Sequence, residues 1–267
     1  MTAGSLYERD GDGYVGTDCT IGPWDPGAQS GGAVLALLGH VLEDVPSLTP
    51  MSLARLTVDI VRPVPVGQRL QVDADVVREG KKIQLAELVI RAGDTVTTRA
   101  RALRIRDRDV TDLDGMPTST SDDNPAATLP PPEELDGVDH VPWIAPFLKY
   151  GAELRRTWKE PIDGVHAVWC RLRIPVVEDE PVRAASRAAF PLDLANLIGV
   201  DLDPQRATSI NPDVTGHIAR TPVGEWMALT GHTYFAHGPG HGISTAVMSD
   251  AEGVFGVAST SQILDPR

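Results

Sequence analysis

The chain has 267 residues, 42% of them hydrophobic and 23% charged, which is enough for one large or two small globular domains. Its 24 Lys and Arg residues against 37 Asp and Glu residues give a net charge of -13, and this acidic field repels nucleic-acid phosphates and anionic membrane surfaces. The first residues lack the apolar core of a signal peptide, and no apolar run reaches the roughly 18 residues of a membrane span. We therefore expect a cytoplasmic protein that does not bind nucleic acid.

The first half of the chain predicts one helix followed by an antiparallel sheet. Residues Ser30–Asp44 place a capping serine and two glycines before apolar residues at helical spacing. Four strand-like runs, separated by turn signals, follow at Leu53–Pro63, Arg69–Val77, Ile83–Arg91 and Thr95–Ile105. Apolar and polar residues alternate along the second run, which indicates an antiparallel meander with one buried face.

A segment of different composition divides the chain. Residues Met116–Pro142 are rich in Pro, Ser, Thr and acidic residues and cannot bury enough apolar surface to fold alone. The segment predicts a linker between an N-terminal domain of residues 1–115 and a C-terminal domain of residues 143–267.

The second half repeats the order of the first at a nearly constant spacing. A helix candidate at Val182–Val200 precedes a strand-like run at Thr208–Ala219. The later strands also correspond: Arg62–Val76 matches Arg220–Thr233, and Ala92–Asp107 matches Ala251–Asp265. In the first match the spacing is 158 at the strand end (220 minus 62) and 157 after the turn (222 minus 65). In the second match it is 158 (265 minus 107). We interpret the halves as duplicates of an α+β unit. The two helices should lie side by side, and the two sheets should join edge to edge, because pairing satisfies exposed strand edges.

Several segments resemble a known family. GPWDPGAQSGGAVLALLGHVLE followed by LTVDIVRPVPVGQRLQVDADVVREGKKIQ resembles the first hot-dog domain of the thioesterase II family, and INPDVTGHIARTPVGEWMAL with VASTSQIL resembles the second. The resemblance covers nearly the whole chain apart from the linker. It implies a double hot-dog fold, in which each of two tandem repeats wraps an antiparallel sheet around a helix. It also implies hydrolysis of acyl-CoA thioesters, without a cofactor, by a water that an Asp, a Thr or Ser, and a Gln of the second hot-dog bind and activate.

The resemblance also places the catalytic residues. Asp213 in INPDVTGH matches the Asp position, and Gln262 in VASTSQ matches the Gln position. Thr233 is the nearest hydroxyl to the third position, and a shift of one residue would place Tyr234 there instead.

The repeat gives a separate reason to look for the site in the second copy. At the spacing of 158, Asp213 and Gln262 stand where the first copy has Arg55 and Arg104, and an arginine cannot accept a proton from water. Thioester hydrolysis needs such a base. The alternative for both residues is an ordinary solvated strand face. Thr233 replaces Val76 at a spacing of 157, and the alternative for its hydroxyl is a hydrogen bond to backbone.

The start of the first helix is the predicted substrate-binding element. Gly31 and Gly32 would leave free backbone N–H groups facing a thioester oxygen, although close packing of the helix is an equally good explanation for two glycines. His237 and His241 flank a Gly-Pro-Gly turn, and without a third ligand nearby they predict a solvated loop rather than a metal site.

The predicted partner is an acyl-CoA or a related thioester, and a homodimer is expected because the resembling family assembles beyond the single chain. Two other functions stay open. A double hot-dog that has lost its chemistry would bind acyl-CoA without releasing thiol. A hot-dog enoyl-CoA hydratase would need a Gly-Asp-x-Asn-Pro-x-His segment, and INPDVTGH has similar letters in a different order.

Overall fold

The computed structural model describes residues 4–110, 124–141, 144–156, 166–198, 206–236 and 238–267. The first half forms one long helix and most of a sheet. Its elements are β1 (Tyr7–Asp10), β2 (Gly13–Gly16), η1 (Asp18–Thr20), α1 (Gly31–Asp44), β3 (Met51–Ile60), β4 (Arg69–Arg78), β5 (Ile83–Ala92) and β6 (Thr95–Arg106). These bounds agree closely with the helix and the four strands predicted from the sequence.

The second half repeats this order, preceded by short elements. These are η3 (Pro125–Thr128), η4 (Pro132–Glu134), β7 (Asp136–Gly137), and the π-helical turn η5 (Phe147–Gly151). The remaining elements are β8 (Ala152–Arg156), β9 (His166–Leu172), α2 (Ala184–Asp193), η6 (Leu194–Leu197), β10 (Ala207–Ile210), β11 (Asp213–Ile218), β12 (Met227–Phe235), β13 (His241–Asp250) and β14 (Gly253–Pro266).

The strands form one sheet that runs through both halves. Its order is β1-β2-β4-β5-β6-β3-β11-β14-β13-β12-β9-β8-β7, and β10 also pairs with β14. The halves join where β3 and β11 pair antiparallel. Thr215 lies opposite Thr57 there, with 3.4 Å between their hydroxyl oxygens, and these residues are 158 positions apart. A pseudo-twofold axis therefore passes between them, and the predicted edge-to-edge joining of the sheets is confirmed.

Strand registers show which positions of the two copies correspond. In the first copy Arg104 lies opposite Gln84 on the neighbouring strand, and in the second copy Gln262 lies opposite Gly242. Gln262 is 158 positions after Arg104, and Gly242 is 158 positions after Gln84, so both strands keep the spacing. Together, β10 and β11 occupy the place of β3. The single strand β3 has a register shift between Leu53 and Arg55, and Pro212, 158 positions after Ala54, interrupts the second copy at the same point. Proline lacks the N–H that a continuous ladder needs, which explains the break.

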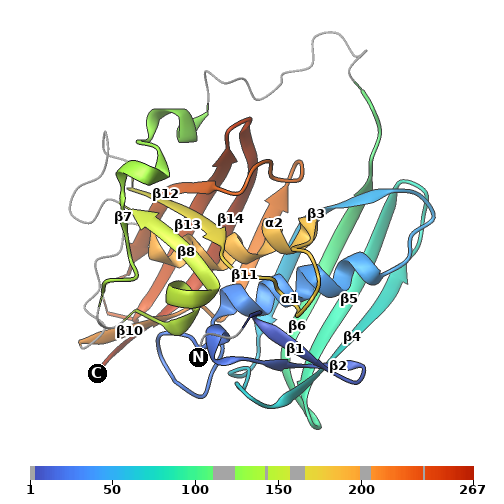
Figure 1. The fold of residues 1–267 in the computed structure, drawn as a ribbon, viewed down its shortest axis with the longest axis horizontal. Coiled ribbons are helices and arrows are strands. Elements are labelled where there is room, and N and C mark those ends of the chain that lie inside the picture. The colour runs from blue at the N-terminus through green and yellow to red at the C-terminus, as the bar shows by residue number, and fades with distance from the viewer. Residues whose placement is uncertain (1–3, 111–123, 142–143, 157–165, 199–205, 237) are drawn as a thin grey trace.

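The two helices lie side by side on the inner face of the curved sheet, as predicted (Figure 1). Their contact depends on small residues. A Cβ at Gly39 would lie 2.6 Å from the backbone carbonyl of Ala185, so glycine is needed for this close approach. The Ser186 hydroxyl donates a 2.9 Å hydrogen bond to the Ala36 carbonyl. Apolar residues of both helices and of strands from both halves form one continuous core.

Part of the predicted linker packs against the second half. Residues 124–137 form η3, η4 and β7, and the Asn124 side chain donates to the Asp250 carbonyl at 3.0 Å. The Trp169 indole donates to the Pro130 carbonyl at 3.0 Å, and Leu129 packs near that ring. This stretch gains from the sheet the apolar contacts that it lacks by itself. Residues 116–123 and 142 of the segment lie outside the described residues.

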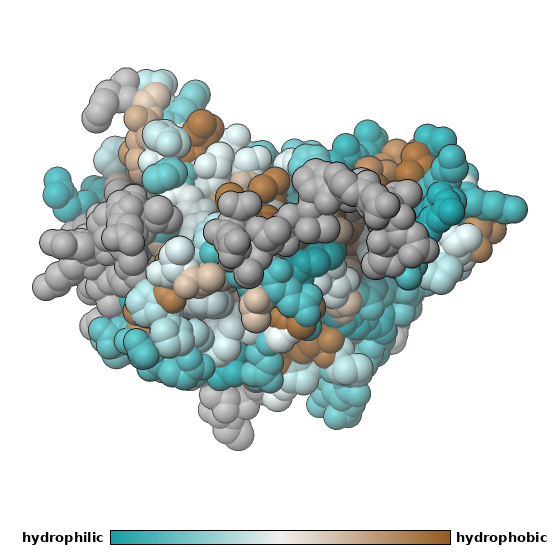
Figure 2. All heavy atoms as spheres, turned by 90° about the horizontal axis from the view of Figure 1, so that it is seen from above, coloured by the Kyte–Doolittle hydropathy of each residue, from teal (hydrophilic) through white to brown (hydrophobic). Residues whose placement is uncertain are grey.

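Hydrophilic residues cover most of the face seen from above, and the hydrophobic residues of its described part form small separate groups (Figure 2). None of the helices in the described ranges is long and apolar enough to cross a membrane.

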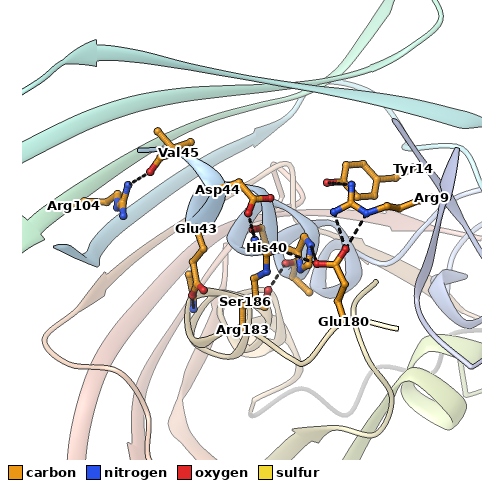
Figure 3. A network of polar contacts seen from close by, with 12 residues as sticks. Arg9, Tyr14, His40, Glu43, Asp44, Val45, Arg104, Glu180, Arg183 and Ser186 are labelled. Carbon is orange, nitrogen blue, oxygen red and sulfur yellow. Dashed lines mark hydrogen bonds and ion pairs between the residues drawn. The ribbon is translucent and has the colours of Figure 1, made fainter. Parts of the chain in front are cut away.

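A polar network near the C-terminal end of α1 ties the first copy to the second (Figure 3). The His40 side chain is fully buried, and its Nε2 lies 3.2 Å from a carboxylate oxygen of Glu180 without the alignment of a hydrogen bond. Glu180 accepts hydrogen bonds from Arg9 and Arg183, and Arg183 also donates to Asp44. Burial, followed by the charge of Arg183, lowers the pKa of His40 to about 4.

This pKa predicts acid sensitivity. In the unfolded chain His40 takes up a proton near its ordinary pKa of 6.5, whereas in the folded chain it stays neutral down to about 4. The free energy of unfolding should therefore decrease as the pH falls from about 6.5 to 4, by up to about 3 kcal/mol from this residue. Urea unfolding at pH 7 and at pH 4.5 measures the loss. His40→Gln should show a smaller loss over that interval than the unchanged chain, and equal losses in the two proteins would contradict the prediction.

Candidate active site

The start of α1 receives a buried carboxylate from the second copy. Ser30 occupies the N-cap position of α1, but its side chain makes no capping hydrogen bond. The backbone N–H of Gly32 donates instead to Asp193, the last residue of α2. Asp193 is only 6% exposed. The positive end of the 14-residue helix α1 therefore faces a carboxylate, which is a favourable arrangement.

Asp193 also explains the two glycines. A Cβ at Gly31 would overlap the Asp193 carboxylate, and a Cβ at Gly32 would lie 2.8 Å from the Phe147 ring. Close packing thus accounts for both glycines, and the same packing brings the helix amides to the carboxylate. Gly31 supplies the first amide of the helix, which has no acceptor within the helix itself.

Asn211 holds Asp193 from the sheet. Its side-chain amide donates to Oδ1 of Asp193, and its own oxygen accepts a 3.0 Å hydrogen bond from Asn196. Burial raises the pKa of Asp193, against the opposing effect of the hydrogen bonds from Asn211 and Gly32. A carboxylate with a raised pKa binds a proton more readily, as a general base requires.

A directed chain of hydrogen bonds fixes Gln262. The Ser209 hydroxyl donates to Oε1 of Gln262 at 2.5 Å, and Nε2 of Gln262 donates to the Ser244 hydroxyl. Ser244 lies 2.6 Å from the hydroxyl of Thr233, which donates at 2.7 Å to the Ile198 carbonyl. Each hydroxyl has one proton, so the chain runs in one direction from Ser209 to Ile198. The other N–H of the Gln262 amide has no acceptor among the described residues and can donate to a water or a substrate oxygen.

Ser209 and Asn211 connect the two groups. They are two residues apart, on either side of Ile210, and both are buried whereas Ile210 is exposed. Their side chains therefore share the inner face of the sheet. Ser209 reaches Gln262 and Asn211 reaches Asp193. We refer to these two hydrogen-bonded groups, which face the same side of the sheet, as the polar cluster.

Asp213 does not join this cluster. It begins β11 beside Val214, whose side chain is fully buried on the inner face, so Asp213 lies on the outer face of the sheet while Gln262 lies on the inner one. Its Oδ1 accepts a 2.9 Å hydrogen bond from the Ser261 backbone, and its carbonyl accepts a 2.6 Å hydrogen bond from the Thr260 hydroxyl. These contacts secure the junction of β11 and β14 just after the break at Pro212. The predicted pairing of Asp213 with Gln262 on one water does not fit this geometry.

Thr233 does lie in the cluster, through Ser244, and its donor is used on a backbone carbonyl. The neighbouring residue Tyr234 is exposed on the other face. His237 lies outside the described residues.

Sequence reasoning missed Asp193, Asn211, Ser209 and Ser244. One signal for Asp193 was present in the sequence: it is an acidic residue within the apolar stretch FPLDLANL of the predicted helix Val182–Val200. That feature favours a carboxylate that is kept for a purpose other than solubility.

The first copy has lost the polar groups at the corresponding positions. Ser209, Asn211, Thr233 and Ser244 stand where it has Met51, Leu53, Val76 and Ala86, by the registers of the paired strands. This asymmetry leaves one candidate site for each chain, as the sequence predicts.

The chain matches known proteins over nearly its whole length. The acyl-CoA thioesterase N-terminal domain matches residues 20–105, and the acyl-CoA thioesterase C-terminal domain matches residues 122–264. No curated protein sequence matches the chain.

Solved structures resemble the fold at low sequence identity. A protein of unknown function with a hot dog fold from Alicyclobacillus acidocaldarius has a TM-score of 0.71 and 16% identity, with 98% of this chain and 96% of that one covered. An acyl-CoA thioesterase II from Mycobacterium marinum has a TM-score of 0.65 and 16% identity, with the same coverage of 98% and 96%. These similarities establish the double hot-dog fold.

Proposed function

Because its halves match the N-terminal and C-terminal domains in order, the chain belongs to the acyl-CoA thioesterase family, and we propose that it hydrolyses acyl-CoA with a water activated by Asp193 and held by Gln262. The observation that carries this proposal is the buried Asp193 carboxylate at the start of α1, in the same cluster as the fixed Gln262 amide. No residue of the first copy at these strand positions offers the same chemistry.

In the proposed reaction, the free N–H of Gln262 orients a water next to Asp193. The water oxygen attacks the thioester carbonyl carbon while its proton passes to the Asp193 carboxylate. The amide of Gly31 and the positive end of α1 stabilise the negative charge that forms on the carbonyl oxygen. The carbon–sulfur bond then breaks, and protonated Asp193 returns its proton to the departing CoA thiolate. The products are a carboxylic acid and CoA.

Free thiol release from a series of acyl-CoA substrates tests the proposed function. A thioesterase releases one thiol for each acid formed, and the dependence on acyl length identifies the preferred substrate. Binding of acyl-CoA without thiol release would support a noncatalytic role, and hydration of crotonyl-CoA without thiol release would support a hydratase.

We also propose the cytoplasmic location that the sequence predicts, where acyl-CoA substrates would be available. Fractionation of the source cells tests this location.

We also propose that the chain forms a homodimer through the outer face of β12, β13 and β14. Exposed apolar side chains stand on this face at Tyr234, Ile243, Val257 and Ile263. The outer face of β4, β5 and β6 instead carries charged pairs, such as Arg101 with Glu87. A twofold contact needs a self-complementary surface, and a face with exposed apolar side chains and few charges meets this need better than one with exposed charged pairs.

Light scattering at micromolar concentration is expected to give the mass of a dimer. Ile243→Asp should shift the protein to a monomer because two buried charges would face each other across the twofold axis. Val77→Asp is the matched control, since Val77 and Ile243 are both 55% exposed but lie on different halves of the sheet. A monomeric unchanged chain, or equal effects of both substitutions, would contradict the proposed contact.

A further inference from the structure

The pseudo-twofold axis relates the candidate active site to a second location, and a cavity lies there. Its volume is about 340 Å³, at the lower end of the roughly 300–1,000 Å³ of typical ligand pockets. It lies between the C-terminal end of α1, the N-terminal end of α2 and the start of β3. Its lining includes Glu43, Met51, Leu53, Arg104 and Ala185.

The helices repeat the carboxylate contact of the active site at this cavity. The Ala185 backbone N–H, in the first turn of α2, donates to the Glu43 carboxylate at 2.5 Å. Gly32 donates to Asp193 in the same way at the start of α1. Glu43 therefore makes at the start of α2 the contact that Asp193 makes at the start of α1, although the two acids are not equivalent helix positions: the donors are 153 positions apart (185 minus 32) and the acids 150 (193 minus 43).

The other groups of the site have changed. Arg104 stands at the position of Gln262, and the apolar residues Met51 and Leu53 stand at the positions of Ser209 and Asn211. An amide binds neutral groups as donor and acceptor, whereas a guanidinium only donates and carries a positive charge. At these positions the second location thus has two apolar side chains and a cation instead of a polar cluster.

Arg104 is nine-tenths buried without a counter-charge in contact. Two hydrogen bonds leave from its Nη1, one to the Val45 carbonyl at 2.8 Å (Figure 3) and one to Oε1 of Gln84 at 2.9 Å. Among the residues that the structure describes, no carboxylate forms an ion pair with it. Burial lowers the pKa of Arg104 and outweighs the carboxylates of Glu43, Glu79 and Asp107, which favour its charge from a distance. An anion in the adjoining cavity, in direct contact with the guanidinium, would lower the remaining cost of burying this charge.

Two acidic residues also line the cavity, and neither prevents an anion from binding. The Glu43 carboxylate is held by the Ala185 N–H at the positive end of α2, which partly balances its charge. Asp107 follows the end of β6 and is exposed, so solvent and salt screen its charge.

We propose that this cavity binds the carboxylate of a short-chain aliphatic acid, with the acid group on Arg104 and the chain against Met51, Leu53 and Ala188. Such an acid is a product of the proposed reaction, so a role of this cavity in product inhibition would rest on the proposed function, whereas the binding itself does not.

Calorimetric titration of the full chain with sodium hexanoate tests the proposal. Arg104→Gln, which restores the residue type of the second copy, should weaken binding about tenfold or more because a charge-assisted contact is lost. Arg101→Gln is the control, since Arg101 lies on the same strand but on the outer face. In the unchanged chain, 1-hexanol should bind at least about tenfold more weakly than hexanoate, because it lacks the charge.

Arg104→Gln also loses the hydrogen bond to Val45 and could fail to fold, so a second variant tests the cavity without changing Arg104. Ala184 is an exposed residue at the cavity, and Ala184→Trp should block hexanoate without disturbing the core. Asp193→Asn should keep hexanoate binding even if it hydrolyses no thioester, which separates the two proposals. Unchanged binding in both Arg104→Gln and Ala184→Trp, or loss in Asp193→Asn alone, would overturn the proposed site.

Discussion

Replacing Asp193 by Asn is expected to lower kcat/KM for acyl-CoA hydrolysis by about a hundredfold to ten-thousandfold, the range typical of losing a general base. The substitution keeps the shape of the side chain and an oxygen that can accept from Gly32 or Asn211. It removes the negative charge that, in the proposed reaction, accepts the proton of the attacking water. Free thiol release gives the rate, and circular dichroism with thermal unfolding confirms that the variant folds.

Asp213→Asn is the matched control. It makes the same chemical change in the same copy, on the opposite face of the sheet, where the Asp213 side chain accepts from the Ser261 backbone. Its rate should stay within a few-fold of that of the unchanged chain. A large loss in Asp213→Asn together with a near-normal rate in Asp193→Asn would return the base to the residue that the sequence predicts.

The pH dependence of kcat/KM provides an independent readout. Burial raises the pKa of Asp193, so activity should decline on the acid side at a pH above the ordinary value for a carboxyl group, as protons occupy the base. Activity that persists unchanged to the ordinary carboxyl pKa would argue against Asp193 as the base.

The fold could be predicted from the sequence because the strand-like runs of the two halves match at a nearly constant spacing. The spacings of 157 and 158 read from the sequence are the ones that the paired strands show, as at Val76 with Ala86 and Thr233 with Ser244. Strand spacing is fixed by the ladder of hydrogen bonds, so an insertion would shift every later contact. Gln262 and Thr233 could be placed in the cluster for this reason.

Comparing positions at the strand spacing did not find Asp193, because the helices do not keep that spacing. The two helices begin 153 positions apart (184 minus 31) and not 157 or 158, since the segments that connect helix and sheet differ in length between the copies. Loop length changes at little cost in stability. The helix contact also joins residues from different copies, which no pattern within one copy reveals. Asp213 was favoured because it matches the Asp position of the resembling family and replaces an arginine of the first copy, but the alternation of β11 points its side chain to the outer face.

Gln262→Ala is expected to lower kcat/KM by about a hundredfold to a thousandfold, the range for removing one donor that positions charge in the transition state. The variant also leaves the hydroxyls of Ser209 and Ser244 without their shared partner. Gln84→Ala controls for this structural cost, because Gln84 is a fully buried glutamine in the first copy, with hydrogen bonds to Pro46 and Glu79. It should reduce the stability of the fold and leave the rate per folded molecule nearly unchanged.

The double variant decides whether Asp193 and Gln262 act on the same water. Once Asp193→Asn has removed the base, a water held by Gln262 is no longer activated, so losing the amide as well should cost little more. The combined loss of kcat/KM should therefore be smaller than the product of the two single losses, by about tenfold or more. The four proteins are compared in one thiol-release assay at the same fraction folded. Losses that multiply would mean that the two residues act independently, with Gln262 binding the substrate away from the water.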